Sequence, residues 1–160
     1  MKKATTPFFA SRRSAEQVEL GNDLAPRFDA ECLLPAIVIN TADKSVLMLG
    51  YMNAEALELT LTTKQAHLWS CSGNIWKGGH SGFTQSVERV LIDDDQDAII
   101  LYVAIAGPGS CHVGFKSCFY REIDLGAVST NEPGKLLAIE SHRAFDVDSV
   151  YCGLPNPTKL

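Results

Sequence analysis

"LPAIVINTADKSVLMLGY", residues 34–51, contains two runs of aliphatic and β-branched residues on either side of a short polar segment. The segment "TADK" is typical of a turn, so the stretch predicts a β-hairpin. The pattern then changes at "NAEALELTLTTKQ", residues 53–65. Asn53 is a typical N-cap residue, and Leu57 and Leu61 lie four positions apart. We therefore expect a short amphipathic helix whose apolar face packs on the hairpin.

Later runs have the composition of further strands, and one short helix is too few for repeated βαβ units. The runs are "AHLWS" at 66–70, "FTQSVERVLI" at 83–92 and "AIILYVAI" at 98–105, with one more candidate strand in "KLLAIES" at 135–141. The sequence predicts an α+β fold with a mostly antiparallel β-sheet and one or two short helices.

The composition of the chain fits one domain. It has 160 residues, of which 46% are apolar and 21% charged. We expect a flexible leader over residues 1–27, a main domain over 28–121, and a C-terminal extension of the same domain over 122–160. No apolar run approaches the roughly 20 residues of a membrane helix, so we expect a cytoplasmic protein. The net charge of −5 argues against a nucleic-acid partner.

Four aspartates crowd the stretch "LIDDDQDAII", residues 91–100. If strand geometry persists, Asp93, Asp95 and Asp97 project to one side, and Asp94 to the other. Three carboxylates on one side repel one another unless a cation lies among them, and Mg²⁺ prefers such oxygen ligands. The alternative is a solvated hairpin tip, where aspartate is common.

Five cysteines without an export signal make metal ligation a better explanation than a disulfide framework. Cys111 and Cys118 lie in the glycine-containing loop "GPGSCHVGFKSCFYR", residues 107–121. Two thiolates on one loop can hold a soft ion, usually zinc. Two other interpretations stay open: the cysteines are small buried apolar groups, or Cys111 pairs with His112 for nucleophilic catalysis.

The segment "HLWSCSGNIWKGGHSGF", residues 67–83, mixes glycines with small polar residues, two tryptophans and Lys77. Glycines let backbone amides approach a phosphate, and a lysine adds a positive charge. A structural loop has the same composition.

Together these segments resemble the phosphoribosyl-AMP cyclohydrolase family, whose members open the adenine ring in histidine biosynthesis. The resemblance covers roughly residues 28–121. It rests on "FD" at 28, "LPAIVIN" at 34, "VLMLGYMNAEAL" at 46, "AHLWS" at 66, "KG" and "SG" near 77–82, the aspartates and the cysteine loop.

The resemblance implies a set of site residues. Asp93, Asp95 and Asp97 correspond to Mg²⁺ ligands, and Cys111 and Cys118 correspond to ligands of a catalytic Zn²⁺. In the family a third cysteine, donated by the other subunit of an intertwined homodimer, completes the zinc site. Its position here is occupied by Asp94. We expect a Cys2Asp site that holds Zn²⁺ or, because an oxygen replaces a thiolate, Mn²⁺, Fe²⁺ or Co²⁺. Cys71 or Cys152 is the alternative third ligand.

A second departure affects substrate binding. Family members usually read "SRSR" and later "KGE", where this chain reads "SCSGN" and "KGG". By this resemblance, Cys71 and its small neighbours replace arginines that could hold the substrate phosphates, and Gly79 replaces a glutamate. The residues assigned to substrate binding are Trp69, Lys77, Ser81, Lys116 and Arg121.

The resemblance implies attack by an activated water on C6 of the adenine ring. His112 is the candidate for proton transfer, with orientation of the loop as its alternative role. Two other functions stay open: a diverged paralog that hydrolyses another purine-like nucleotide, and a non-catalytic metal-binding domain.

Overall fold

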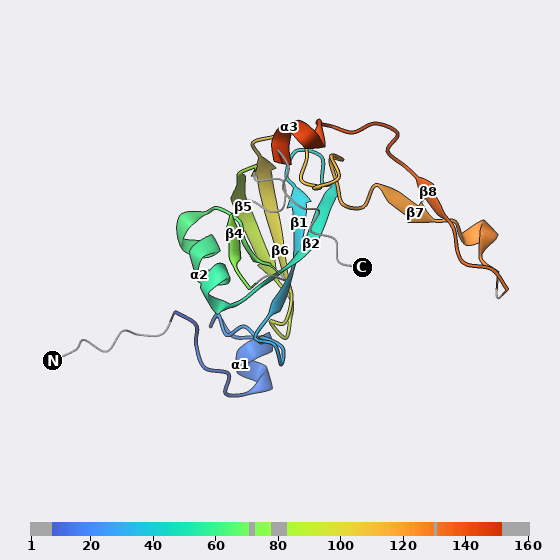
Figure 1. Ribbon diagram of the computed structural model, residues 1–160. Helices are drawn as coiled ribbons and strands as arrows, with labels where there is room; N and C mark the ends of the chain where they lie inside the picture. Colours follow the sequence, from blue (N-terminus) through green and yellow to red (C-terminus); the bar gives the residue numbers. More distant parts are fainter. Residues whose placement is uncertain (1–7, 71–72, 78–82, 130, 152–160) are drawn as a thin grey trace.

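The structure is a computed structural model of the chain, and it describes residues 8–70, 73–77, 83–129 and 131–151 (Figure 1). Within these residues a curled sheet has six strands in the order β4-β3-β2-β1-β6-β5. The strands are β1 (Leu34–Asn40), β2 (Val46–Met52), β3 (His67–Trp69), β4 (Ile75–Lys77), β5 (Gln85–Ile92) and β6 (Ile99–Ile105). β1 and β6 run parallel, and the other neighbours run antiparallel. The predicted α+β class with a mostly antiparallel sheet is confirmed.

The predicted hairpin and helix are also confirmed. β1 and β2 pair antiparallel over residues 34–52, with an irregularity after Val38. The helix is α2 (Ala54–Thr63). The side chain of Asn53 accepts a hydrogen bond from the backbone N–H of Ala56 over 2.8 Å, which caps the first turn as its sequence position predicts.

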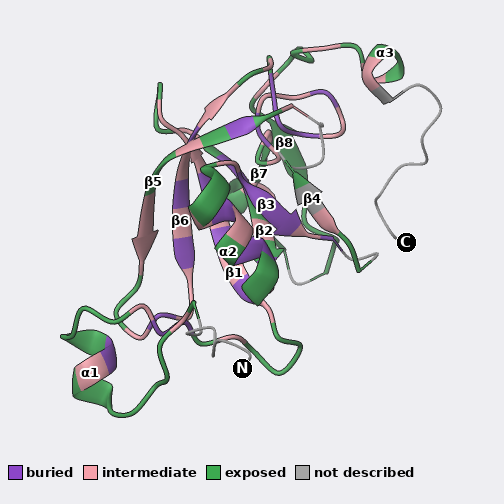
Figure 2. Cartoon of the chain, turned by 90° about the vertical axis from the view of Figure 1, so that its left-hand side faces the viewer, coloured by how far each residue is buried: buried purple, intermediate pink, exposed green. Residues whose placement is uncertain are grey.

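α2 packs on one face of the sheet, chiefly along β3 (Figures 1 and 2). Leu57 contributes its buried side chain to the core on that face. Thr60 is fully buried and links the helix to β3. Its hydroxyl donates to the carbonyl of Ala56 at 2.8 Å and accepts from the backbone N–H of His67 at 2.9 Å. The helix is therefore held to the sheet by a polar contact as well as by apolar packing.

The two faces of the sheet differ in exposure because strand side chains alternate. The face toward α2 is dry, and its members at 2% exposure or less include Leu34, Ala36, Val38, Ile99, Leu101 and Val103. The opposite face remains apolar although it is more exposed. We call it the outer face and define it by Ile37, Leu49, Tyr51, Ile100 and Tyr102, which lie in register across β1, β2 and β6. Leu49 is 48% exposed and Tyr51 is 43% exposed.

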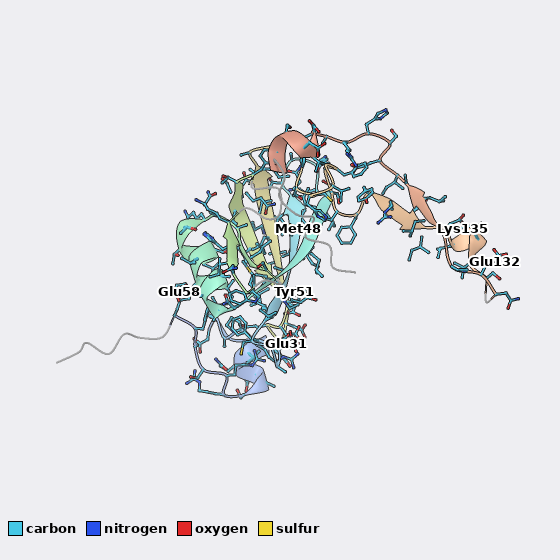
Figure 3. All side chains as sticks on the ribbon, viewed as in Figure 1. Glu31, Met48, Tyr51, Glu58, Glu132 and Lys135 are labelled. Carbon is cyan, nitrogen blue, oxygen red and sulfur yellow. The ribbon has the colours of Figure 1, made fainter. Side chains whose placement is uncertain are left out.

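A second, two-stranded sheet projects from the main body (Figure 1). It pairs β7 (Arg121–Ile123) with β8 (Leu136–Ala138), and the 3-10 helix η1 (Leu125–Ala127) lies between them. β8 confirms the candidate strand in residues 135–141. Leu125 is 82% exposed on this hairpin, and Glu132 and Lys135 lie near its far end in Figure 3.

The segment before β1 has defined contacts, although we expected residues 1–27 to form a flexible leader. It contains α1 (Ala15–Glu19), and the buried side chain of Gln96 joins it to the hairpin between β5 and β6. The Gln96 side-chain carbonyl accepts from the N–H of Ala25 at 2.8 Å, and its amide donates to the carbonyl of Val18 at 2.9 Å. The predicted domain boundary after residue 27 stays a prediction.

The helices are few and short, and α3 (Val147–Tyr151) is the last one described. Over the part of the chain that the structure describes, no helix combines the length and apolar character needed to cross a bilayer.

Candidate functional site

The clustered aspartates lie on the turn between β5 and β6. The expected strand geometry is wrong here, because the side chain of Asp93 closes the turn. It accepts hydrogen bonds from the backbone N–H groups of Asp97 at 2.8 Å and Ala98 at 3.0 Å. Gln96 adopts a left-handed conformation, with φ of 59°, which also belongs to a turn.

The turn still gathers the three expected carboxylates. One oxygen from each of Asp93, Asp95 and Asp97 lies within 4.8 Å of the others. We call these residues the aspartate group. Among the described residues it is the one set of three or more acidic, histidine or cysteine side chains that meets this distance. Asp94 lies outside it and is exposed. Three oxygen donors at this separation suit a hard divalent cation.

Arg27 lies against the aspartate group. Its guanidinium donates to a carboxylate oxygen of Asp95 at 2.7 Å and to one of Asp97. The hydrogen bond from Arg27 holds the pKa of Asp97 below its ordinary value, and the same contact raises the pKa of Arg27. Sequence reasoning missed Arg27, which lies 68 positions before Asp95.

The cysteine loop is fixed to the start of β2. The backbone N–H of Cys118 donates to the carbonyl of Leu47 at 2.7 Å, and the hydroxyl of Ser117 donates to the carbonyl of Val46 at 2.7 Å. Cys111 is only 2% exposed. These contacts hold the part of the loop that carries Cys118 against β2.

The chemistry of the two thiols fits a soft metal ion. A hydrogen bond from Cys118 lowers the pKa of Cys111 to about 6, and the same pairing raises the pKa of Cys118 well above its ordinary value. Both are free thiols, as is the exposed Cys32. The buried hydroxyl of Ser110, next to Cys111 in the chain, has no hydrogen-bond partner among the described residues. Zinc-type ions favour a thiolate pair that already has one low pKa.

The other predicted residues of this loop are placed as follows. His112 is half-buried beside Cys111. The ammonium of Lys116 forms an ion pair with Asp43, which keeps the pKa of Asp43 far below its ordinary value. Arg121 begins β7, with its guanidinium 4.9 Å from the ring centroid of Tyr120.

The glycine-rich segment is only partly described. Trp69 is half-buried on β3 opposite Tyr51 of β2, and Lys77 is exposed at the end of β4. The predicted substrate residue Ser81 and the alternative metal ligands Cys71 and Cys152 lie outside the described residues.

A groove runs along the end of the sheet where β1 begins. It consists of two adjoining cavities of about 690 and 550 Å³, which share Asp29, Leu33 and Tyr51. The larger cavity reaches Arg27 and Asp97, and the smaller one reaches Trp69, Ser70 and Gly73. Figure 3 shows Tyr51 above Glu31, which also lines the smaller cavity. The groove joins the aspartate group to the predicted substrate residue Trp69.

Within one chain the aspartate group and the cysteine pair are far apart. Cys118 is bonded to Leu47, opposite the second half of β1, whereas Ala98 precedes Ile99, which pairs with Ala36 near the start of β1. By this register, Leu47 and Ala98 lie roughly 13 Å apart along the strand direction. They lie about 10 Å apart across the sheet, because two strand spacings separate β2 from β6. Figure 1 shows the β5–β6 turn and the loop after β6 at opposite ends of the sheet. The ligands of one zinc-type ion lie within about 4 Å of one another, so one chain does not bring these two groups together.

Comparison with known proteins gives a consistent result. The model of the phosphoribosyl-AMP cyclohydrolase family matches residues 48–120. A protein of Erythrobacter litoralis with that name is 50% identical over 120 residues, covering 74% of this chain and 95% of the relative. Relatives of the same name from Rhizobium rhizogenes and Caulobacter vibrioides are 43% and 44% identical, covering 90% and 80% of this chain and 96% and 94% of their own lengths. The chain therefore belongs to the phosphoribosyl-AMP cyclohydrolase family.

Proposed function

We propose that this chain hydrolyses phosphoribosyl-AMP in histidine biosynthesis. Water adds to C6 of the adenine ring, the bond between N1 and C6 breaks, C6 becomes a carboxamide carbon, and N1 takes up a proton. The observation that carries the proposal is the 43% identity over 90% of the chain to a relative of that name. The catalytic unit would be residues 28–121, followed by the extension 122–160, in the cytoplasm.

Two metal sites fit the side chains present. Cys111 and Cys118 would hold Zn²⁺, or Mn²⁺, Fe²⁺ or Co²⁺ in its place, and the aspartate group would hold Mg²⁺. The low pKa of Cys111 supports the first site, because a thiolate is available near neutral pH. The three converging oxygens support the second. When bound, the ion at the cysteines supplies a water of lowered pKa for attack on C6.

The residues of the chain would bind the nucleotide and move the proton. Trp69 lines the groove, where its ring would stack on the base of the nucleotide. His112 follows a metal ligand in the chain and has an imidazole that can both take up and give a proton, so it is our candidate to deliver the proton to N1. Lys77 and Arg121 are exposed cations available for phosphate. Ser81 is proposed as a substrate-binding residue because of its position in the sequence alone.

We propose further that the site is shared by two copies of the chain. The cysteine pair lacks a third ligand in its own chain, at least among the described residues. Asp94 is exposed at the opposite end of the sheet, where a second chain can bring its own cysteines. The exposed apolar side chains of the outer face support such an assembly, because monomeric proteins seldom leave large apolar patches uncovered. In this homodimer Asp94 of each chain completes the metal site of the other.

The reaction is tested with metal-stripped full-length protein. Phosphoribosyl-AMP is supplied with Mg²⁺, and Zn²⁺, Mn²⁺, Fe²⁺ or Co²⁺ is added in separate reactions. We expect ring opening, measured by the absorbance change of the purine, with one or more of these ions. Folded protein that is inactive with every ion would contradict the proposal.

One observation favours a second candidate, a paralog that hydrolyses another purine-like nucleotide. The substrate phosphates have lost two arginine partners in the sequence, and the ammonium of Lys116 is engaged by Asp43. A panel of purine nucleotides that differ in the number of phosphates separates the two candidates. Faster turnover of a nucleotide with fewer phosphates would favour the paralog.

A further inference from the structure

We propose that Arg27 acts as a built-in competitor of the divalent cation at the aspartate group, so that a metal ion binds only by displacing its guanidinium. This inference rests on the proposed magnesium site. It adds Arg27, which lies in the segment before the sheet, as a residue that sets the affinity of the aspartate group for Mg²⁺.

The contacts of Arg27 coincide with those that a metal ion requires. A single terminal nitrogen of its guanidinium bonds to Asp95 and to Asp97, using one carboxylate oxygen of each. Each of these residues also belongs to the set of three whose oxygens converge. A magnesium ion needs such oxygens at about 2.1 Å, which leaves no space for a nitrogen between them. The two cations therefore exclude each other.

The backbone of Arg27 is anchored, whereas its side chain is exposed to solvent. Its N–H donates to the carbonyl of Gln96 at 2.7 Å, and Gln96 also holds Ala25 by a side-chain hydrogen bond. The side chain of Arg27 is 53% exposed. Displacement therefore requires the guanidinium to leave Asp95 and Asp97 and rotate into solvent, while the backbone keeps it close to the aspartates.

The negative charges of the aspartate group explain why a nearby arginine stabilises the metal-free turn. Asp93, Asp95 and Asp97 repel one another at this distance when no cation is present. Arg27 offsets part of this repulsion and keeps the turn in the geometry that a metal ion would use. The result is a group that is preformed without metal but binds metal more weakly than it would without the arginine.

The test is the affinity of metal-stripped full-length protein for Mg²⁺, measured by isothermal titration calorimetry at low, constant ionic strength. Arg27→Gln keeps the backbone contact to Gln96 and removes the charge. The matched control is Arg13→Gln, because Arg13 forms its exposed ion pair with Asp23 at 3.0 Å and does not contact the aspartate group. Asp95→Asn identifies the site, since it should abolish the measured binding. Thermal unfolding without metal shows whether each variant is folded.

We expect Arg27→Gln to bind Mg²⁺ roughly tenfold more tightly than the unchanged protein, with Arg13→Gln within about twofold of it. Equal affinity of Arg27→Gln and the unchanged protein would overturn the inference and leave the magnesium site intact. Equal tightening in both arginine variants would also overturn it, because the effect would then come from net charge. If no folded protein binds Mg²⁺, the magnesium site itself is wrong and the inference fails with it.

Discussion

Cys118 donates a hydrogen bond to the sulfur of Cys111, and this contact lowers the pKa of Cys111 from 9.0 to about 6. The pair therefore carries one thiolate and one thiol near neutral pH. The second proton is harder to remove, because Cys118 would lose the hydrogen bond that it donates to Cys111, and because burial and the first thiolate both disfavour a second negative charge. A metal ion that binds both sulfurs supplies the positive charge that the second ionisation needs.

The first prediction concerns the ionisation of metal-free protein. One thiolate should form as the pH rises through about 6, since a lowered pKa favours the charged form above that value. Thiolate absorbance in the ultraviolet measures it. Cys111→Ser should remove this step, and Cys118→Ala should move it toward the ordinary thiol pKa because the donor is lost. A first ionisation that stays above pH 8 in the unchanged protein would contradict the hydrogen bond between the sulfurs.

The second prediction concerns metal content. Cys111→Ser and Cys118→Ser should each lower the bound zinc-type ion to less than about a tenth of that in the unchanged protein, because each removes one of few ligands. Elemental analysis of the purified protein measures this. Cys32→Ser is the control, since Cys32 is an exposed free thiol that lies outside the cysteine loop. Metal content that is unaffected by either loop substitution would show that the ion binds elsewhere.

The third prediction concerns the groove. Trp69→Ala should raise KM by about tenfold or more, because base stacking on an aromatic ring contributes about 1–3 kcal/mol. kcat should change less, since stacking on the base stabilises the bound substrate and the transition state alike. The measurement is steady-state kinetics with phosphoribosyl-AMP. Phe8→Ala is the matched control, because Phe8 is an aromatic residue that is 45% exposed and does not line the groove. An unchanged KM for Trp69→Ala would place the nucleotide elsewhere.

The fourth prediction tests the contact between α2 and β3. Thr60→Val should lower the free energy of unfolding by about 1–3 kcal/mol, because it leaves the buried N–H of His67 without its acceptor. Thr62→Val is the control: its exposed hydroxyl bonds only within the helix, to the carbonyls of Glu58 and Leu59. Urea denaturation measures both variants. Equal stability of the two would mean that the Thr60 contact contributes nothing.

Local elements of the fold were predictable from the sequence. The hairpin over 34–51 is recognised from two apolar runs and a polar turn. The helix is recognised from Asn53, whose side chain accepts a hydrogen bond from the backbone N–H of Ala56 three positions later. The parallel pairing of β1 with β6 was not predictable, because it joins Ala36 to Ile99 and depends on how the intervening elements pack. The strand alternation expected at Asp93 was wrong because its side chain bonds the backbone of the turn.

The candidate site was predictable to a similar degree. The residue types of the aspartate group and the cysteine loop indicated metal chemistry, and the resemblance supplied their roles. The contact of Arg27 with Asp95 was missed, since an arginine 68 positions away leaves no periodic signal. The pairing of Lys116 with Asp43 was missed for the same reason, since they lie 73 positions apart.

We propose that one site is built from two chains, with Cys111 and Cys118 from one and Asp94 from the other. The most direct test uses two inactive variants, Cys111→Ser and Asp94→Ala, which are unfolded and refolded together. In a mixed dimer one site carries both changes, and the other has intact cysteines and an intact Asp94. Random pairing then restores about a quarter of the unchanged activity, since half of the dimers are mixed and each has one working site of two. The control is Glu88→Ala, which removes an exposed acidic side chain on β5 outside the proposed site. This variant should be active without a partner variant. Activity of the mixture no higher than that of the separate variants, with dimers shown to exchange chains, would contradict the shared site.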